Sequence, residues 1–170
     1  FNNWSITFYG TPEPDEDNDG LPNYVDYKLG TGINNSDFDA DGLLDGEEYY
    51  GWTDIKGNFH KTNPKIKDTD EDGLSDYIEI SNCVYGGNNT GTLCTNPLHN
   101  DSDGDSLVDG AEVNVANTDP LDIDSDNDGL TDFQEVNGWD NNNVNHGYGP
   151  TDPLDDDSDN GHVRDGTEVN

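Results

Sequence analysis

The sequence lacks most of what an ordinary globular domain is built from. Apolar residues make up only 28% of its 170 residues, methionine is absent, and 6 Lys and Arg face 39 Asp and Glu, so the net charge is −33. Low hydrophobicity with high net charge is typical of a disordered chain, and it excludes a large buried core. The chain has no basic stripe for binding nucleic acid, and no apolar run approaches the ~18 residues of a membrane span. Something must therefore neutralise the acids if the chain is to fold.

An acidic pattern of twelve residues recurs six times. In DSDNDGLTDFQE (124–135), acids stand at positions 1, 3, 5, 9 and 12 and Gly at position 6, which is the ligand pattern of a calcium loop. We number the copies along the chain as loop 1 (15–26), loop 2 (37–48), loop 3 (68–79), loop 4 (101–112), loop 5 (124–135) and loop 6 (157–168). Loop 4 has Ser106 at position 6, and loop 6 has Gly161 at position 5 and His162 at position 6. One acidic run is usually a solvated face, but six copies in register indicate Ca²⁺ binding.

The spacing follows from the coordination chemistry of calcium, which takes about six to eight oxygens at ~2.3–2.6 Å. Side chains at positions 1, 3 and 5 converge on the ion, position 6 turns with positive φ, and position 7 offers its carbonyl. Position 9 usually holds a water, and the acid at position 12 closes the shell. The predicted ligands are Asp15, Asp17, Asp19, Leu21, Asp26, Asp37, Asp39, Asp41, Leu43, Asp45, Glu48, Asp68, Asp70, Asp72, Leu74, Asp76, Glu79, Asp101, Asp103, Asp105, Leu107, Asp109, Glu112, Asp124, Asp126, Asp128, Leu130, Asp132, Glu135, Asp157, Asp159, Val163, Asp165 and Glu168.

We expect five to six calcium ions or more. Six ions would reduce the net charge from −33 to −21. Four further acids between the loops could add oxygens to neighbouring ions, or could simply face water: Asp119, Asp122, Asp152 and Asp155.

A threonine stands six residues before each of loops 2 to 6. The last four of these threonines open a T-(N/D)-P sequence, in which proline keeps the preceding residue out of the helical region. We interpret each as a stiff corner that aims the chain into the next loop. The threonines are Thr31, Thr62, Thr95, Thr118 and Thr151.

The few apolar residues recur at positions 7, 10 and 13 of the loops, a spacing that places them on one side of a short helical turn. Position 10 alternates between an aromatic residue and glycine, which predicts that the repeats work in pairs, with a ring covering the glycine of its neighbour. Many small cores would then lie along the chain, as in solenoid arrays. The residues at position 10 are Tyr24, Gly46, Tyr77, Gly110, Phe133 and Gly166.

Three inserts lengthen the steps between loops, and the only two cysteines, Cys83 and Cys94, stand at the two ends of one of them. We predict a Cys83–Cys94 disulfide that closes a hairpin, with two free thiols as the alternative. The other two inserts would use Trp52 with Phe59, and Trp139 with Tyr148. An even cysteine count in such an acidic chain favours an oxidising, extracellular setting.

The N-terminus differs from the repeats. In residues 1–11, Trp4, Ile6 and Phe8 alternate with polar residues, which predicts the terminal β-strand of an upstream domain. Residues 12–14 form a linker, and residues 15–170 form the six-repeat calcium-binding array. Because the chain has neither an initial Met nor a signal peptide, we expect it to be a fragment of a longer protein.

The loops differ from ordinary EF-hands, because their apolar residue is at position 7 rather than 8. The string DxDxDGLPxxxD at Asp15 resembles a thrombospondin type 3 repeat, and DSDNDGLTDxxEV and TDPLxxDSD resemble its bacterial and archaeal version. Separately, NWSITFYGT (3–11) is similar to the last strand of the P domain that follows subtilisin-like proteases. The first resemblance implies a mostly irregular, calcium-stabilised, elongated repeat array without a large core. It would have EF-hand-like loops, short helical turns and small β-hairpin inserts, in a secreted or surface protein. The departures at Ser106, Gly161 and His162 put the affinity of loop 4 and the occupancy of loop 6 in doubt.

These patterns favour a non-enzymatic function. The leading hypothesis is an extracellular spacer or stalk that calcium stiffens, joined to an upstream β-domain or protease of the same chain, with no nucleic acid partner and no membrane insertion. The alternative is an interaction or self-assembly module, for adhesion or filaments, whose aromatic inserts bind a protein, a glycan or another copy. Four histidines are scattered without a nucleophile motif nearby, so we expect no catalysis: His60, His99, His146 and His162.

Overall fold

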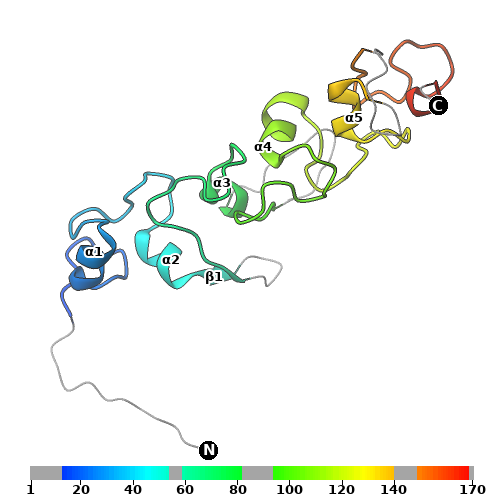
Figure 1. Cartoon of the computed structure of the whole chain (residues 1–170). Helices are drawn as coiled ribbons and strands as arrows, with labels where there is room; N and C mark the ends of the chain where they lie inside the picture. Colours follow the sequence, from blue (N-terminus) through cyan, green and yellow to red (C-terminus); the bar gives the residue numbers. More distant parts are fainter. Residues whose placement is uncertain (1–12, 54–58, 82–93, 140–148, 169–170) are drawn as a thin grey trace, which may run out of the picture. The chain divides into compact units, whose positions relative to one another are not determined.

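The computed structural model describes residues 13–53, 59–81, 94–139 and 149–168. The chain divides into two compact units, Phe1–Lys67 and Asp68–Asn170, and each is described by itself. In both units, long loops alternate with helices of one or two turns (Figure 1).

Within these residues, an α-helix begins at position 9 of every loop. The first unit contains α1 (Asn23–Leu29) and α2 (Asp45–Tyr50), followed by the strands β1 (Trp52–Thr53) and β2 (Phe59–His60). The second unit contains α3 (Asp76–Ser81), α4 (Asp109–Ala111) with its π-helical continuation η1 (Glu112–Ala116), α5 (Asp132–Asn137) and α6 (Asp165–Glu168). An acid at the start of a helix is favourable, because the N-terminal end of the helix dipole is positive. Each helix, or in loop 4 its continuation η1, also contains the position-12 acid of its own loop.

The loops turn where the sequence predicts. Position 6 has positive φ in all six loops, from 71° at His162 to 114° at Gly42. Ser106 adopts the same left-handed conformation with φ 90°, although its Cβ makes that conformation costly. The backbone path of loops 4 and 6 is therefore kept despite the missing glycines.

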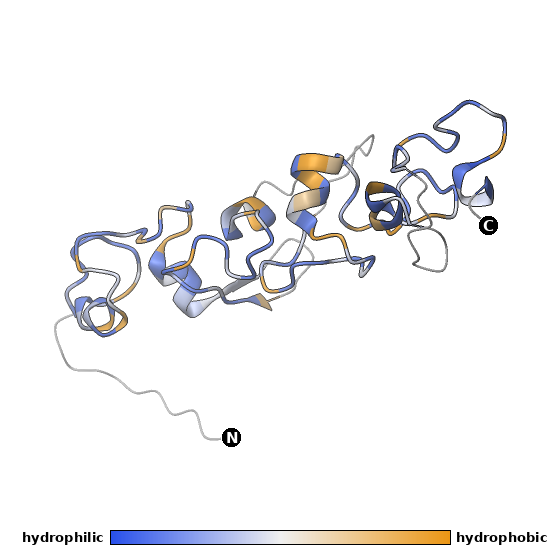
Figure 2. Ribbon diagram, turned by 45° about the horizontal axis from the view of Figure 1, so that its top comes forward, coloured by the Kyte–Doolittle hydropathy of each residue, from blue (hydrophilic) through white to orange (hydrophobic). Residues whose placement is uncertain are grey.

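The apolar core of the described residues is small. Hydrophobic residues lie in separate short stretches of the ribbon, divided by hydrophilic ones (Figure 2). The position-7 leucines of loops 1, 2, 3 and 5 are buried as predicted, but Val163 of loop 6 is 42% exposed. The prediction for position 13 fails at Tyr27, which is 83% exposed, because α1 turns that side chain outwards. Acids and threonines fill most of the interior instead. The fully buried side chains are Leu21, Leu130, Glu48, Glu79, Glu112, Glu135, Thr31, Thr118, Asp26, Asp45, Asp76 and Asp109.

Loops 1 and 2, 3 and 4, and 5 and 6 pack together, but the contact differs from the expected one. The packing is not limited to these pairs, because the Phe133 N–H of loop 5 donates to Asp105 of loop 4 at 2.7 Å, as that of Gly166 does to Asp128. Each position-10 glycine lies against the main chain of position 5 in the preceding loop. A Cβ at Gly110 would lie 2.8 Å from the carbonyl carbon of Asp72, and one at Gly166 would lie 2.6 Å from the carbonyl oxygen of Asp128. Gly46 makes the same approach to Asp19. The prediction of a covering aromatic ring is wrong at this point, because the backbone of the neighbour occupies that space and Tyr24 is 54% exposed.

Two of the inserts make ring contacts within the described residues. β1 and β2 form an antiparallel pair with Trp52 opposite His60, and these two rings stack with centroids 5.9 Å apart. The predicted partner, Phe59, is 65% exposed, because successive side chains of a strand point to opposite faces. Trp139 meets the ring of Phe133 in a T-shaped contact at 5.1 Å.

Several sequence predictions fall outside the described residues. These are the N-terminal strand, the pairing of Trp139 with Tyr148, and Cys83 of the predicted disulfide; Cys94 itself is buried. In the part of the chain that the structure describes, no helix has both the length and the apolar character needed to cross a membrane.

Candidate metal centres

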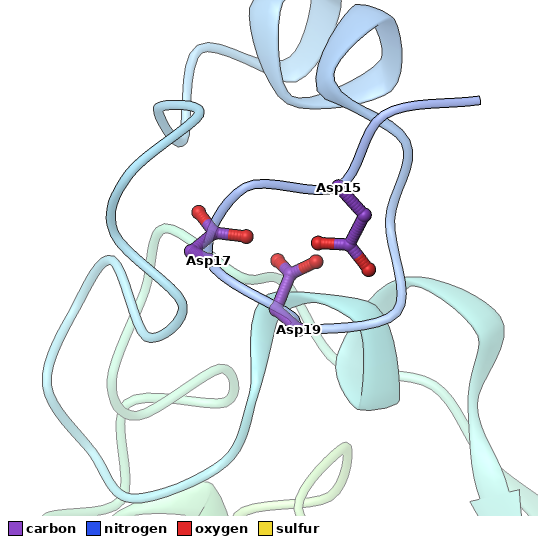
Figure 3. A group of neighbouring side chains, drawn as sticks. All are labelled: Asp15, Asp17 and Asp19. Atoms are coloured by element: carbon purple, nitrogen blue, oxygen red, sulfur yellow. The ribbon is translucent and has the colours of Figure 1, made fainter. Parts of the chain in front are cut away.

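The first three acids of a loop converge on one point. Figure 3 shows this for loop 1, where the carboxylates of Asp15, Asp17 and Asp19 turn towards the space inside the curve of the chain. One oxygen from each lies within 4.8 Å of the others. The acids at positions 1, 3 and 5 of loops 2, 3 and 4 form the same group.

The loop backbone holds one oxygen of these carboxylates. In all six loops, the position-6 N–H donates to Oδ2 of the position-1 aspartate, over 2.8–3.2 Å. In loops 1 to 5, the position-7 N–H donates to Oδ1 of the position-5 aspartate, over 2.6–2.7 Å. The acids are therefore oriented by the fold before any ion is considered.

Other carboxylate oxygens are buried and receive no hydrogen bond within the described residues. They include both oxygens of Asp17, Oδ2 of Asp103 and Asp126, and Oε2 of Glu112 and Glu135. A buried carboxylate oxygen without a donor is costly, and such groups in native proteins are satisfied by a partner. A cation with several oxygen ligands is the partner that this donor set fits.

The pKa values of the buried carboxyls also favour a bound cation. Burial, reinforced by the neighbouring carboxylates, raises the pKa of Asp72 and Asp103 to about 7. The same causes raise the pKa of Glu79 and Glu112 to about 9 and that of Glu135 to about 8. These groups would hold protons near neutral pH unless another positive charge replaced them.

The acid at position 9 has a role that the calcium-loop template does not include. In loops 2 to 6 it is buried, and its Oδ1 accepts the N–H of position 2 over 2.7–3.2 Å. In loop 1, Asn23 accepts the N–H of Glu16 in the same way. Position 9 thus closes the loop, and a part in calcium ligation by the five aspartates stays a prediction.

Pairing also brings together acids from two loops. One ligand atom each of Asp72 and Glu79 in loop 3 and of Asp109 in loop 4 lie within 4.8 Å of one another, and all three side chains are buried. Sequence reasoning placed Asp109 only in its own loop. The alternation at position 10 was the available signal, because it predicts which loops lie against each other.

Loop 6 differs from the others. Gly161 leaves position 5 without a carboxylate, and Asp159 and Glu168 are exposed. The negative charge of Asp159 is nevertheless near enough to raise the pKa of Glu168. The loop still docks on loop 5, since Arg164 donates to the carbonyl of Asn127 at 2.9 Å.

Sequence reasoning missed one further set of residues. The threonines six residues before loops 2 to 6 donate their hydroxyls to the closing acid of the preceding loop, over 3.0–3.5 Å. The constant spacing was visible in the sequence, but it indicated a corner and not a contact. Asp119 and Asp152, considered as extra ligands, each accept an N–H from two residues further on.

Comparison with known proteins agrees with this geometry. Segments 68–82, 101–123 and 124–138 match the family model of the bacterial TSP3 repeat, and each begins at position 1 of loop 3, 4 or 5. The bacterial TSP3 repeat is a calcium-binding structural repeat, so these segments, less than half of the chain, are similar to such a module. No curated protein and no solved structure matches the chain significantly. No comparison supports the P-domain resemblance of residues 3–11.

Proposed function

We propose that this chain is an extracellular calcium-binding spacer, a stalk within a larger secreted or surface protein that becomes stiff when its loops bind Ca²⁺. The observation that carries the proposal is that the carboxylate oxygens of the loops fall into two groups, those that accept a hydrogen bond within the described residues and those that do not. The backbone holds some of their oxygens, while others, such as Oε2 of Glu112, are buried and receive no hydrogen bond from the part of the chain that the structure describes. Each loop offers several carboxylates and a carbonyl, a set that suits Ca²⁺ better than Mg²⁺, which usually keeps several of its waters.

The same observation explains why the ion would control folding. Few apolar side chains are buried, and the interior consists largely of carboxylates that repel one another. Extracellular calcium modules bind with Kd of about 10⁻⁴–10⁻³ M. At a free Ca²⁺ of ~100 times Kd, each filled site would stabilise the folded chain by roughly 2.7 kcal/mol. We propose five to six ions, with loop 6 the weakest site.

The second candidate is an interaction or self-assembly module. It is favoured by the exposed aromatic rings of Tyr24, Tyr27 and Phe59, which are 54%, 83% and 65% exposed. The packing of Trp52 on His60 and of Trp139 on Phe133 favours the spacer, because these rings serve their own repeats.

We also retain the Cys83–Cys94 disulfide within this proposal. It would be formed in an oxidising compartment, and it would close the insert between loops 3 and 4. Thiol counting under denaturing conditions, with and without prior reduction, tests it: two free thiols without reduction would contradict it.

The first experiment is a Ca²⁺ titration of chelator-treated protein, followed by far-UV circular dichroism and thermal melting, with Mg²⁺ as the control. The proposal expects a disordered spectrum in chelator and cooperative melting only with Ca²⁺. A chain that melts identically in chelator and in Ca²⁺ would contradict it, because the inserts would then hold the fold without ions.

Two neighbouring glutamates of α2 provide a matched pair of variants. Glu48 closes loop 2 and is fully buried, whereas Glu47 is exposed. We expect Glu48→Gln to lose about one calcium equivalent in equilibrium dialysis, since an amide neither carries the charge nor closes the shell as well. Glu47→Gln should keep the full number. Equal loss in both variants would indicate a general effect of charge and not a site.

A further inference from the structure

Each of the five threonines between the loops donates the same kind of hydrogen bond, to the closing acid of the preceding loop. The number of residues between donor and acceptor differs widely. The hydroxyl of Thr31 donates to Asp26 across 5 residues, that of Thr118 to Glu112 across 6, and that of Thr151 to Glu135 across 16. Thr62 and Thr95 reach Glu48 and Glu79 across 14 and 16 residues. Whatever the length of the insert, the chain returns to the closing acid of the loop that it has left.

The corner sequence does not explain this contact. Thr31 is followed by Gly-Ile and not by (N/D)-P, yet its hydroxyl and its N–H both donate to Asp26, at 3.5 and 3.2 Å. The N–H groups of Thr118 and Thr151 donate to the carbonyls of Glu112 and Glu135 in the same way, at 3.2 and 3.3 Å. Side chain and main chain together therefore fix the threonine on the closing residue.

The contact divides the two oxygens of the closing carboxylate. In Glu112, Oε1 accepts the hydroxyl of Thr118 at 3.3 Å, whereas Oε2 is buried and receives no hydrogen bond within the described residues. Glu135 shows the same division with Thr151 at 3.0 Å, and so does Asp26 with Thr31. Glu112 and Asp26 are completely buried, so the threonine decides which oxygen is left for another partner.

We propose that each of these threonines is a positioning residue for the calcium site of the preceding loop. Its hydroxyl holds one oxygen of the closing acid and presents the other to the ion. This inference rests on the proposed calcium function. Hydrogen-bond partners of metal-binding side chains typically change metal affinity by about 10–100-fold when they are removed. The threonine also ties the site to the first residue of the segment that leads into the next loop.

The test uses the full chain and measures calcium release into a fluorescent chelator by stopped flow, starting from saturating Ca²⁺. Thr118→Val keeps the shape of the side chain and removes the donor, and Thr118→Ser keeps the donor. Thr151→Val is a second variant at a half-buried site, in case Thr118→Val does not fold. Thr53→Val, at an exposed position of β1, is the matched control.

We expect one calcium equivalent to leave about 10-fold faster from Thr151→Val, with the other phases unchanged. Thr118→Val should accelerate one equivalent, or at most the two of loops 4 and 5, because the Thr118 side chain also hydrogen-bonds Asp132 of loop 5. Thr118→Ser and Thr53→Val should release calcium as the wild type does. A residue needed only for packing would accelerate every phase, and serine would not rescue it; that result would overturn the inference. Wild-type phases in both valine variants would also overturn it and leave the calcium function intact. A wild-type chain that binds no calcium would instead refute the proposed function itself.

Discussion

The close approach of paired loops makes Gly110→Ala a sharp test of the packing. An added Cβ would lie 2.8 Å from the carbonyl carbon of Asp72 and 3.1 Å from that of Gly73, and closer still to the oxygen of Asp72. These are main-chain atoms, so no side-chain rotation relieves the contact, and loops 3 and 4 must move apart. Overpacking of this kind costs about 1–3 kcal/mol. Alanine within α4 is favoured over glycine by roughly 1 kcal/mol, so the net cost is up to about 2 kcal/mol. For a chain of this size, we expect the Tm in saturating Ca²⁺ to fall by up to about 8 °C.

The control is Gly149→Ala, because a Cβ there meets no atom within 4 Å and the position does not require positive φ. Thermal melts of both variants and the wild type, at one saturating Ca²⁺ concentration, measure the difference. If Gly110→Ala melts at or above the temperature of Gly149→Ala, the backbone contact between loops 3 and 4 does not exist as described.

Three further predictions concern the sites themselves. Gly161→Asp with His162→Gly should add about one calcium equivalent in equilibrium dialysis, because it restores the acid and the glycine of loop 6; an unchanged count would show that exposure of the loop prevents binding. Burial raises the pKa of Glu112 to about 9 and that of Asp103 to about 7 in the calcium-free fold, above the ~4 of unfolded carboxyls. The calcium-free fold therefore binds more protons than the unfolded chain, so its stability is greatest at low pH and falls as the pH rises from about 4 to about 9. Circular dichroism of the chelator-treated chain across this pH range measures the effect, and a helix signal that does not increase towards low pH would contradict these shifts. Glu112→Gln should weaken this pH dependence, because it removes one carboxyl whose pKa the fold raises.

Much of each candidate site could be predicted from the sequence, because the ligands of a calcium loop are close to one another along the chain. Its ligands lie within twelve residues, and their spacing is set by the size of the ion and the curl of the chain. The acids at positions 1, 3 and 5 converge as expected, and position 6 has positive φ even where Ser106 and His162 replace glycine. The position-7 leucines are buried in four loops for the same local reason.

The sequence predictions that were wrong concern contacts between different segments of the chain. The partner of Trp52 is His60 and not Phe59, because the register of a two-residue strand pair selects which side chain faces it. Tyr24 does not cover Gly46, because the main chain of Asp19 lies there instead. A main-chain contact does not depend on residue type, so the sequence gives no sign of it. Both contacts depend on how one segment lies against another, and spacing within a single repeat does not determine that.

The sequence by itself determined the number of loops and their candidate ligands, since both follow from residue type at a fixed local spacing. Only the tertiary structure decided that position 9 closes its own loop, that Asp109 lies beside Asp72 and Glu79, and that a threonine holds the closing acid in loops 1 to 5. The physical reason is distance along the chain. Inserts of variable length separate the threonine from its acid by 5 to 16 residues, and only folding brings the two together.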